Sequence, residues 1–584
     1  MARPRFIVVG GGLAGLMTTI RIAEAGFPVD LFSLVPVKRS HSVCAQGGIN
    51  AAVNWKGEGD SPWRHFDDTI YGGDFLANQA PVKAMCEAGP AIIFLLDRMG
   101  VPFNRTPEGL LDFRRFGGTL FHRTAFAGAT TGQQLVYALD EQVRRHEAAG
   151  LVRKFEKWEL CSAVIDEAGH CRGITALDLT RMEVHAFPAA AVMLATGGPG
   201  MVFGKSTNSV VNTGSAAGAV YQQGAYYANG EFIQVHPTAI PGPDKLRLIS
   251  ESIRGEGGRV WVPRDGRPWY FLEDWYPAYG NLVPRDIATR AIFKVVFEMG
   301  LGIGGEPMVY LDVSHLDPVV LERKVGGVLE IYEKFVGDDP RKVPMKIFPG
   351  MHYSMGGLWV DAGQKTNVPG LFAAGEVDYQ FHGANRLGAN SLLSCLYSGQ
   401  IAGPAMVAHA TGQATAPADG IFEQEARRQQ RAYDRIIAMD GPESAYLLAR
   451  EMGEWMTANV TVIRDNRKLA DTEQKLVELK DRWGRIGIAD RGRWLNHDVS
   501  FVKQLWNMLE LARVITVGAL RRDESRGAHY KPEFPNRDDA RWLKTTKARW
   551  TSDGPELSYE PVDVSLIPPR PRKYDVTDAA ESHA

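Results

Sequence analysis

The chain begins with a short apolar run that ends in a glycine cluster. Residues 5–33, RFIVVGGGLAGLMTTIRIAEAGFPVDLFS, predict a buried strand, a glycine turn, an amphipathic helix and a second strand. Gly10, Gly12 and Gly15 form G-x-G-x-x-G in the setting where this motif binds a dinucleotide. The glycines let the backbone approach a pyrophosphate at the helix N-terminus. The alternative is a glycine-rich turn that binds no ligand.

Two later apolar runs predict further strands of the same sheet. AAVMLATGG, residues 190–198, and LFAAGE, residues 371–376, resemble the strand ends that flank FAD in flavoproteins with two dinucleotide-binding folds. The acidic residue that commonly ends the second strand and binds ribose is replaced by Ser33, whose hydroxyl can still bond a ribose. The glycine motif alone does not distinguish NAD from FAD. The distant strands predict a discontinuous FAD domain.

The rest of the hydrophobic pattern predicts that this α/β protein contains several domains. We predict an FAD domain of the two-dinucleotide-binding type at 1–240 and 348–415, interrupted by an α+β capping domain at 241–347. The insert is rich in Pro, Gly and aromatic residues. Residues 416–520 carry apolar positions at three- and four-residue spacing, which predicts a helical domain. A polar, Pro-rich C-terminal domain with little periodicity follows at 521–584.

Composition excludes several function classes. The chain is 45% apolar and 23% charged, with a net charge of −2, so we expect no nucleic-acid partner. No apolar run reaches the ~18 residues of a spanning helix. The first residues superficially resemble a signal peptide, but the apolar run leads into glycines without a cleavage site, so we expect no export signal. Five cysteines without C-x-x-C spacing argue against disulfides, metal sites and iron–sulfur clusters, and fit a reducing cytoplasm.

Residues 38–52, KRSHSVCAQGGINAA, fit neither a helix nor a strand pattern. The longer stretch VPVKRSHSVCAQGGINAAVN resembles the segment for covalent FAD attachment in the flavoprotein subunits of succinate dehydrogenase and fumarate reductase. That resemblance extends over essentially the whole chain. It implies that the ring of His41 bonds the flavin 8α-methyl group and thereby raises the flavin potential. A structural loop histidine is the alternative.

Within the family, three stretches are most similar to menaquinone-linked succinate dehydrogenases of Gram-positive bacteria. They are RTPEGLLDFRRFGGT, GKSTNSVVNTGSAAGAVYQQGAYYANGEFIQVHPTAIP and NLVPRDIATR. Ser215 stands where some relatives carry Asp, so a contact attributed to that Asp is not carried over. Motif and resemblance together predict FAD contacts from Gly10, Gly12, Gly15, Ser33, Arg39, Ser40, His41, Gln46, Gly47, Gly48, Glu376, Ser391 and Leu392.

A dicarboxylate site needs several cations and donors, because an unpaired buried carboxylate is costly. The resemblance implies that the carboxylates of succinate or fumarate are held by His236, Ser250, His352 and Arg386, and that Phe116 caps the substrate. It also implies that Arg285 exchanges the proton. Because arginine is a poor base, Glu251 and Arg254 are expected to relay that proton. Each of these residues alone is more often structural, so the prediction rests on their joint occurrence.

The chain carries no haem motif and no cluster ligands, so its electrons must leave through another molecule. The resemblance implies an iron–sulfur subunit, a membrane-anchor cytochrome b subunit, indirect contact with the quinone pool, and a peripheral position at the cytoplasmic face of the cell membrane. We expect no metal. The segment RRDESRGAHYKPEFPNRDD, residues 521–539, is expected to pack near the flavin.

Three other functions remain open. Succinate oxidation is the first choice, but fumarate reduction uses the same residues in reverse, and the chain does not encode the direction. L-Aspartate oxidases share the fold but lack the tethering histidine, so His41 argues against them. A non-catalytic FAD-binding assembly subunit would not need Arg285, His352 or Arg386.

Overall fold

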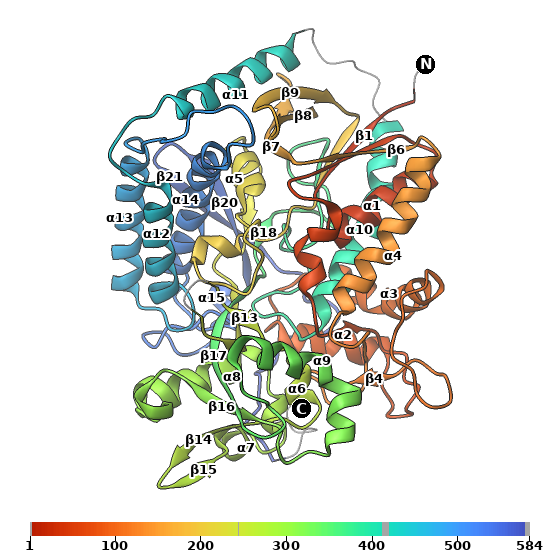
Figure 1. The fold of residues 1–584 in the computed structure, drawn as a ribbon, viewed down its shortest axis with the longest axis vertical. Coiled ribbons are helices and arrows are strands. Elements are labelled where there is room, and N and C mark those ends of the chain that lie inside the picture. Colours follow the sequence, from red (N-terminus) through yellow and green to blue (C-terminus); the bar gives the residue numbers. More distant parts are fainter. Residues whose placement is uncertain (1–2, 243–244, 412–419, 578–584) are drawn as a thin grey trace.

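The centre of the molecule is a parallel sheet built from segments far apart in the sequence. The computed structural model describes residues 3–242, 245–411 and 420–577 (Figure 1). The sheet has the order β19-β10-β1-β2-β6, and every pairing in it is parallel. Its strands are β1 Phe6–Val9, β2 Val29–Ser33, β6 Val152–Glu156, β10 Ala191–Leu194 and β19 Leu371–Ala373. The predicted discontinuous α/β fold is therefore confirmed.

Both faces of this sheet are covered, as its continuous apolar strands require. The helices α1 Leu13–Glu24, α4 Thr131–Ala148 and α10 Asn390–Thr411 pack together on one face. An antiparallel sheet covers the other face and consists of β7 Trp158–Ile165, β8 Cys171–Asp178 and β9 Glu183–Pro188. Helices α2 Pro62–Gly72 and α3 Gln79–Arg98, and the small sheet of β3 Ile49–Asn50, β4 Phe113–Arg114 and β5 Thr124–Ala125, complete this region.

The inserted segment forms a mixed layer of helices and strands at one end of the molecule (Figure 1). Its six-stranded sheet has the order β13-β12-β17-β16-β14-β15. The strands are β12 Ile233–Ile240, β13 Arg247–Leu248, β14 Arg259–Arg264, β15 Arg267–Trp269, β16 Val309–Asp312 and β17 Met345–Ser354. Its helices are α6 Ser252–Gly255, α7 Phe271–Trp275, α8 Arg285–Phe293 and α9 Pro318–Val336. Because β12 pairs with β17, the sheet spans both predicted domain boundaries, at 240 and 348.

The segment predicted to be helical contains four long helices in its described part. They are α11 Ile421–Ile437, α12 Ala445–Asn459, α13 Asn466–Trp483 and α14 His497–Arg521. Their apolar faces form a second core that includes Leu448, Leu476 and Leu505. Helix α14 also packs on α5 Ser215–Tyr221, which joins the helical part to the FAD domain.

The C-terminal part contains a hairpin that the sequence analysis missed. After α15 Asp539–Trp542, strands β20 Lys544–Thr551 and β21 Gly554–Pro561 pair antiparallel, and β20 also pairs with β11 Tyr227–Ala228. Strand β11 in turn pairs with β18 Gly357–Leu358. The turn residues are Ser552 and Asp553, followed by Gly554 with φ +140°, and this Ser-Asp-Gly stretch is a turn signal that was available in the sequence. The signal was missed because one face of the hairpin lies in solvent and carries polar side chains, which weakens the apolar pattern of its strands.

Asp74 ties the C-terminal part to the FAD domain. Its carboxylate accepts hydrogen bonds from the Arg537 guanidinium and the Gly527 N–H, each at 2.8 Å, and lies 3.7 Å from Arg572. Burial alone would raise the pKa of Asp74, but the surrounding arginines outweigh it and hold that pKa below its usual range. The carboxylate is therefore a charged link between distant segments.

Replacing Asp74 by Asn should destabilise the protein at neutral pH. Asp74 has φ +54°, which Asn tolerates, so the expected loss of about 3 kcal/mol comes from arginines left without their buried partner. Because the folded pKa is depressed, this stabilisation is full above the unfolded pKa and is lost as pH falls through the folded value. Thermal unfolding midpoints measured from pH 7 down to about pH 3 should therefore converge for D74N and wild type. A gap that stays constant with pH would contradict this account.

Candidate active site

A cavity of about 550 Å³ lies where the carboxyl ends of the central strands meet the inserted layer. Most of the predicted FAD contacts line it, namely Gly10, Gly12, Ser33, Ser40, His41, Gln46, Gly47, Gly48, Glu376, Ser391 and Leu392. Gly15 and Arg39 do not line it, and Arg39 is exposed at the surface. Ser33 stands at the end of β2, where its hydroxyl donates to the Val35 carbonyl at 2.6 Å.

The glycine motif is required by close packing. A Cβ on Gly10 would lie 2.1 Å from the Ala195 carbonyl oxygen, and Gly10 has φ +117°, which favours glycine. A Cβ on Gly15 would lie 1.9 Å from the Gly10 carbonyl oxygen. Gly15 therefore brings α1 against β1, whereas Gly10 and Gly12 form the cavity wall.

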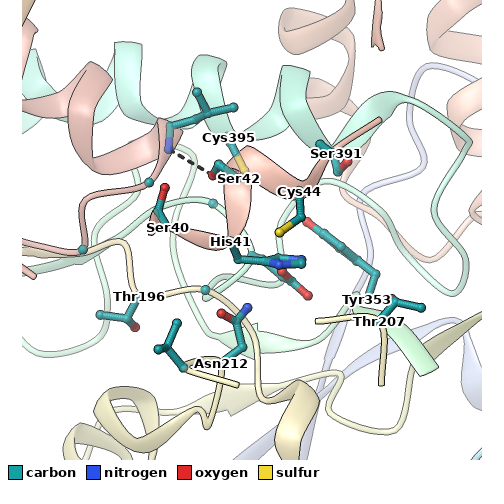
Figure 2. Close-up of a pocket in the computed structure, with 18 of the residues that line it drawn as sticks. Ser40, His41, Ser42, Cys44, Thr196, Thr207, Asn212, Tyr353, Ser391 and Cys395 are labelled. Atoms are coloured by element: carbon teal, nitrogen blue, oxygen red, sulfur yellow. Dashed lines mark hydrogen bonds between the residues drawn. The ribbon is translucent and has the colours of Figure 1, made fainter. Parts of the chain in front are cut away.

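The cavity contains polar atoms that fit a large polar cofactor. Ser40 Oγ, Gln46 Oε1, Thr196 Oγ1 and Asn212 Nδ2 are buried and have no hydrogen-bond partner within the described residues. Figure 2 shows Ser40, Thr196 and Asn212 around one part of the pocket, with His41 beside them. Buried polar atoms are normally satisfied, so these donors and acceptors indicate a bound molecule. With the glycine turn at a helix N-terminus, they fit FAD.

His41 lies in a short 3-10 turn, His41–Cys44, at the edge of this cavity (Figure 2). Its Nδ1 accepts the N–H of Ser209 at 3.1 Å, and its Nε2 lies 3.1 Å from the Asn208 amide nitrogen. Burial, with a smaller effect of Lys245, lowers the pKa of His41 to about 4. The imidazole is therefore neutral at pH 7, and both of its nitrogens lie within hydrogen-bond distance of a neighbouring group.

The predicted proton-relay residues are in direct contact. Arg285 begins α8 and donates through Nε to Glu251 at 2.7 Å, while Arg254 bonds the other oxygen of the same carboxylate. Burial alone would raise the pKa of Glu251, but Arg285 and Arg254 hold it below its usual range. Arg285 and Glu251 line the cavity and Arg254 lies behind them. Arg285 and Glu251 therefore face the cavity, and Arg254 is connected to it through Glu251.

Arg386 is a buried guanidinium with few partners. It is 2% exposed, its Nε has no hydrogen-bond partner among the described residues, and its Nη1 reaches the Leu387 carbonyl only at 3.5 Å. Its guanidinium carbon lies 4.5 Å from the centre of the Tyr353 ring. Burial, and then Arg285, lower the pKa of Arg386 to about 9, so it stays charged at pH 7. A buried charge in this position calls for an anion.

The other predicted substrate residues surround the same space. The ring centroids of His236 and His352 are 4.9 Å apart. Burial, followed by Arg285, lowers the pKa of both histidines well below the usual value, so both rings are neutral. Ser250 Oγ accepts bonds from the Ser252 N–H and hydroxyl, which leaves its own O–H to donate into the cavity. Phe116 is buried and packs on Gly47, where a Cβ would lie 2.6 Å from its ring.

The charges at this end of the cavity do not cancel. Arg254, Arg285 and Arg386 are positive, Glu251 is negative, and the two histidines are neutral. Among these six side chains the excess is two positive charges, which suits a dicarboxylate, and Glu376, whose pKa burial raises to about 7, offsets it only in part. This end of the cavity can therefore bind a small dianion next to the cofactor space.

Two residues of the site were not predicted. Gln234 accepts from Arg285 Nη1 at 2.8 Å, and its amide donates to the Arg386 carbonyl at 2.7 Å. The signal was available, because Gln234 and His236 are two apart on β12 and so share a face. Thr207 Oγ1 lies 2.7 Å from His352 Nδ1, and only the folded chain brings these two residues together.

The structure also places Ser215 and the segment 521–539, for which the sequence analysis stated expectations. Ser215 lines the cavity and accepts from the Asn507 amide at 2.9 Å, so it is held by α14. The segment 521–539 packs beside the site, where the Ala528 N–H donates to the Ala384 carbonyl at 2.9 Å, but no residue of it lines the cavity. Among the described residues no cluster of His, Cys, Asp and Glu could hold a metal ion, and no helix there is long and apolar enough to span a membrane.

The fold and cavity define a flavoprotein oxidoreductase. Residues 5–392 match the FAD binding domain model, and residues 449–574 match the fumarate reductase flavoprotein C-terminal model. The chain belongs to the family of succinate dehydrogenase and fumarate reductase flavoprotein subunits. It is 66% identical to the succinate dehydrogenase flavoprotein subunit of Bacillus subtilis (strain 168) over 100% of both chains. It is 33% identical to the fumarate reductase flavoprotein subunit of Escherichia coli (strain K12), covering 98% of this chain and 97% of the relative.

Solved structures agree with this assignment. A chain of E. coli quinol fumarate reductase superposes with a TM-score of 0.93 at 32% identity, covering 98% of this chain and 99% of that one. Mycobacterium smegmatis Sdh1 superposes with a TM-score of 0.83 at 29% identity, covering 96% and 95%. The resemblance stated from the sequence is therefore confirmed over the whole chain.

Replacing Thr207 by Val should weaken dicarboxylate binding. The change keeps the side-chain shape and removes the partner that orients the His352 ring, so we expect the dissociation constant for malonate to rise about tenfold. Isothermal titration calorimetry with malonate measures it. The matched variant T207S keeps the hydroxyl that bonds His352 and loses only a methyl group, so it should bind within about twofold of wild type. Equal affinity of T207V and T207S would remove the hydroxyl from this role.

Proposed function

We propose that this chain is the catalytic flavoprotein subunit of a succinate:quinone oxidoreductase. It oxidises succinate to fumarate next to an FAD that is covalently bound through His41. The observation that carries the proposal is the excess of positive charge around Arg285 and Arg386 in a buried space that adjoins the cofactor region. Succinate is a dianion with carboxylates at its two ends, and Arg386 supplies a planar fork suited to one of them.

Different residues of the chain bind the substrate, exclude water from it and hold the cofactor. His236, Ser250, His352 and Arg386 hold the carboxylates, and the ring of Phe116 excludes water from the reacting carbons. When bound, FAD supplies a two-electron acceptor for the hydride. Ser40, Gln46, Thr196 and Asn212 would hold that cofactor with the glycine turn.

Arg285 first passes its own proton to the Glu251 carboxylate and then takes the proton from the carbon adjacent to the one that loses hydride. Because the Arg285 guanidinium holds its proton tightly, a fast relay must remove that proton. Glu251, which accepts a hydrogen bond from Arg285 Nε at 2.7 Å, and Arg254 behind it form this relay. The Nη1 of Arg254 donates to the Asn281 carbonyl at 2.6 Å, which holds Arg254, the last group of the relay, in place. Gln234 keeps Arg285 and Arg386 in register, because it bonds both residues.

The electrons then leave the subunit. No haem or cluster ligands are provided by this sequence, so an iron–sulfur subunit receives them and passes them through a membrane-anchor cytochrome b subunit to the quinone pool. In such an assembly the flavoprotein is peripheral and lies at the cytoplasmic face of the membrane. Some relatives are named fumarate reductase flavoprotein subunits. Because the same residues serve both directions, fumarate reduction is the alternative function.

Arg285→Lys should abolish most succinate turnover while leaving the flavin in place. Lysine keeps a positive charge but loses the fork that bonds Glu251 and Gln234 together, so we expect turnover to fall at least about 100-fold. Turnover of the purified complex with a dye acceptor and flavin content by absorbance measure the two effects. Near-wild-type turnover would exclude Arg285 from the proton role.

His41→Ser should leave FAD bound without a covalent link. After acid precipitation, flavin fluorescence should remain with the wild-type polypeptide and appear in the supernatant for H41S. Because the link is expected to raise the flavin potential, H41S should lose succinate oxidation more than fumarate reduction. Flavin in the supernatant for wild type would refute the link, and equal loss of both activities would refute the effect on potential.

A further inference from the structure

The last described residues of the chain cross from the FAD domain to the inserted layer. We call residues 563–577 the C-terminal strap. On the FAD side, Gln79 Oε1 accepts the N–H groups of Leu566 and Ile567 at 2.8 Å each. The Tyr71 hydroxyl accepts the Lys573 N–H at 2.5 Å. The strap is thus anchored along α2 and α3.

Arg572 extends from the strap to the helix that carries Arg285. It donates to both oxygens of Asp286, at 2.8 and 3.1 Å, and the side chains of Arg572 and Asp286 are only 7% and 1% exposed. Asp286 follows Arg285 directly at the start of α8. The ion pair therefore fixes the first turn of α8 from the side away from the cavity.

Other contacts support the same attachment. Within α8, Arg290 donates to the Gly527 carbonyl at 2.6 Å, and before α8 the Ala278 N–H donates to the Val576 carbonyl at 3.2 Å. The rings of Tyr279 and Tyr574 are in edge contact, with centroids 5.1 Å apart. Two C-terminal segments thus hold the region around α8, and only Arg572 contacts Asp286 from the strap among the described residues.

We propose that Arg572 is a positioning residue, which acts through Asp286 to set the start of α8 and so aims Arg285 into the cavity. This inference rests on the proposed function. Without Arg572, the buried Asp286 carboxylate retains the weaker contact with Arg290 at 3.3 Å and the N–H of Ile287, and a buried carboxylate that has lost its main charged partner is costly. The first turn of α8 must then move to satisfy it, and a displacement of about 1 Å at a reacting group can cost about 100-fold in rate.

The test uses the complete complex purified with its partner subunits. In Arg572→Gln we expect kcat for succinate to fall by about tenfold or more, KM to change less than about threefold, and the deuterium isotope effect on kcat to rise. The isotope effect rises because C–H cleavage becomes slower than the other steps when Arg285 is misplaced. Fumarate reduction with a reduced viologen dye should fall in parallel.

Arg570→Gln is the matched control. Arg570 lies on the same strap and donates to both oxygens of Asp67 at 2.8 Å, but Asp67 belongs to α2 and not to the inserted layer. If Arg572 only stabilised the strap, R570Q and R572Q would lower the thermal midpoint together and leave the isotope effect unchanged. That outcome, or a kcat for R572Q within twofold of R570Q, would overturn the proposal.

A double variant covers the case in which R572Q folds poorly. D286N/R572Q removes the buried carboxylate together with its partner, so no unpaired charge displaces α8, and we expect kcat to recover toward wild type. A double variant as slow as, or slower than, R572Q would overturn the proposal. Failure of the wild-type complex to oxidise succinate would instead refute the proposed function, so the two failures are distinguishable.

Discussion

The burial of Arg386 beside the Glu251–Arg285 pair is the constraint on which the site depends. A guanidinium that is 2% exposed and poorly paired is costly unless an anion joins it. Glu251 neutralises part of the charge, but its carboxylate is already shared by Arg254 and Arg285. The folded site therefore carries an excess of positive charge. A dicarboxylate neutralises that excess when it binds, and its binding offsets the free-energy cost of burying Arg386.

The two sides of the cavity come from different parts of the fold. The glycine turn and Thr196 follow the carboxyl ends of β1 and β10, where α/β sheets bind ligands, and loops supply the other unpaired polar atoms, on Ser40, Gln46 and Asn212. The inserted layer supplies Ser250, Glu251 and Arg285. Because β12 and β17 form one sheet through both predicted boundaries, the position of the inserted layer depends on the FAD domain and not on a flexible linker. The C-terminal strap adds a second attachment at α8.

Much of this arrangement followed from local sequence patterns. The strand–glycine–helix order identified the nucleotide turn, because a backbone with positive φ at Gly10 and close packing at Gly15 leaves little choice of residue. The two later apolar strands, the helical spacing from residue 416 and the family motifs predicted the fold, and most of the site residues predicted in this way line the cavity. The polar hairpin at 544–561 was missed because its exposed face does not alternate clearly.

The sequence by itself determined the chemical groups and the sheet that carries them, since backbone conformation and strand burial are encoded by neighbouring residues. Only the tertiary structure decided which groups meet. Thr207 and His352 are 145 positions apart, and Asp286 and Arg572 are 286 apart. Such pairs leave no periodic trace, because their energy depends on burial and distance in the folded chain. Whether Arg39 or Arg386 is the buried cation was likewise decided by packing.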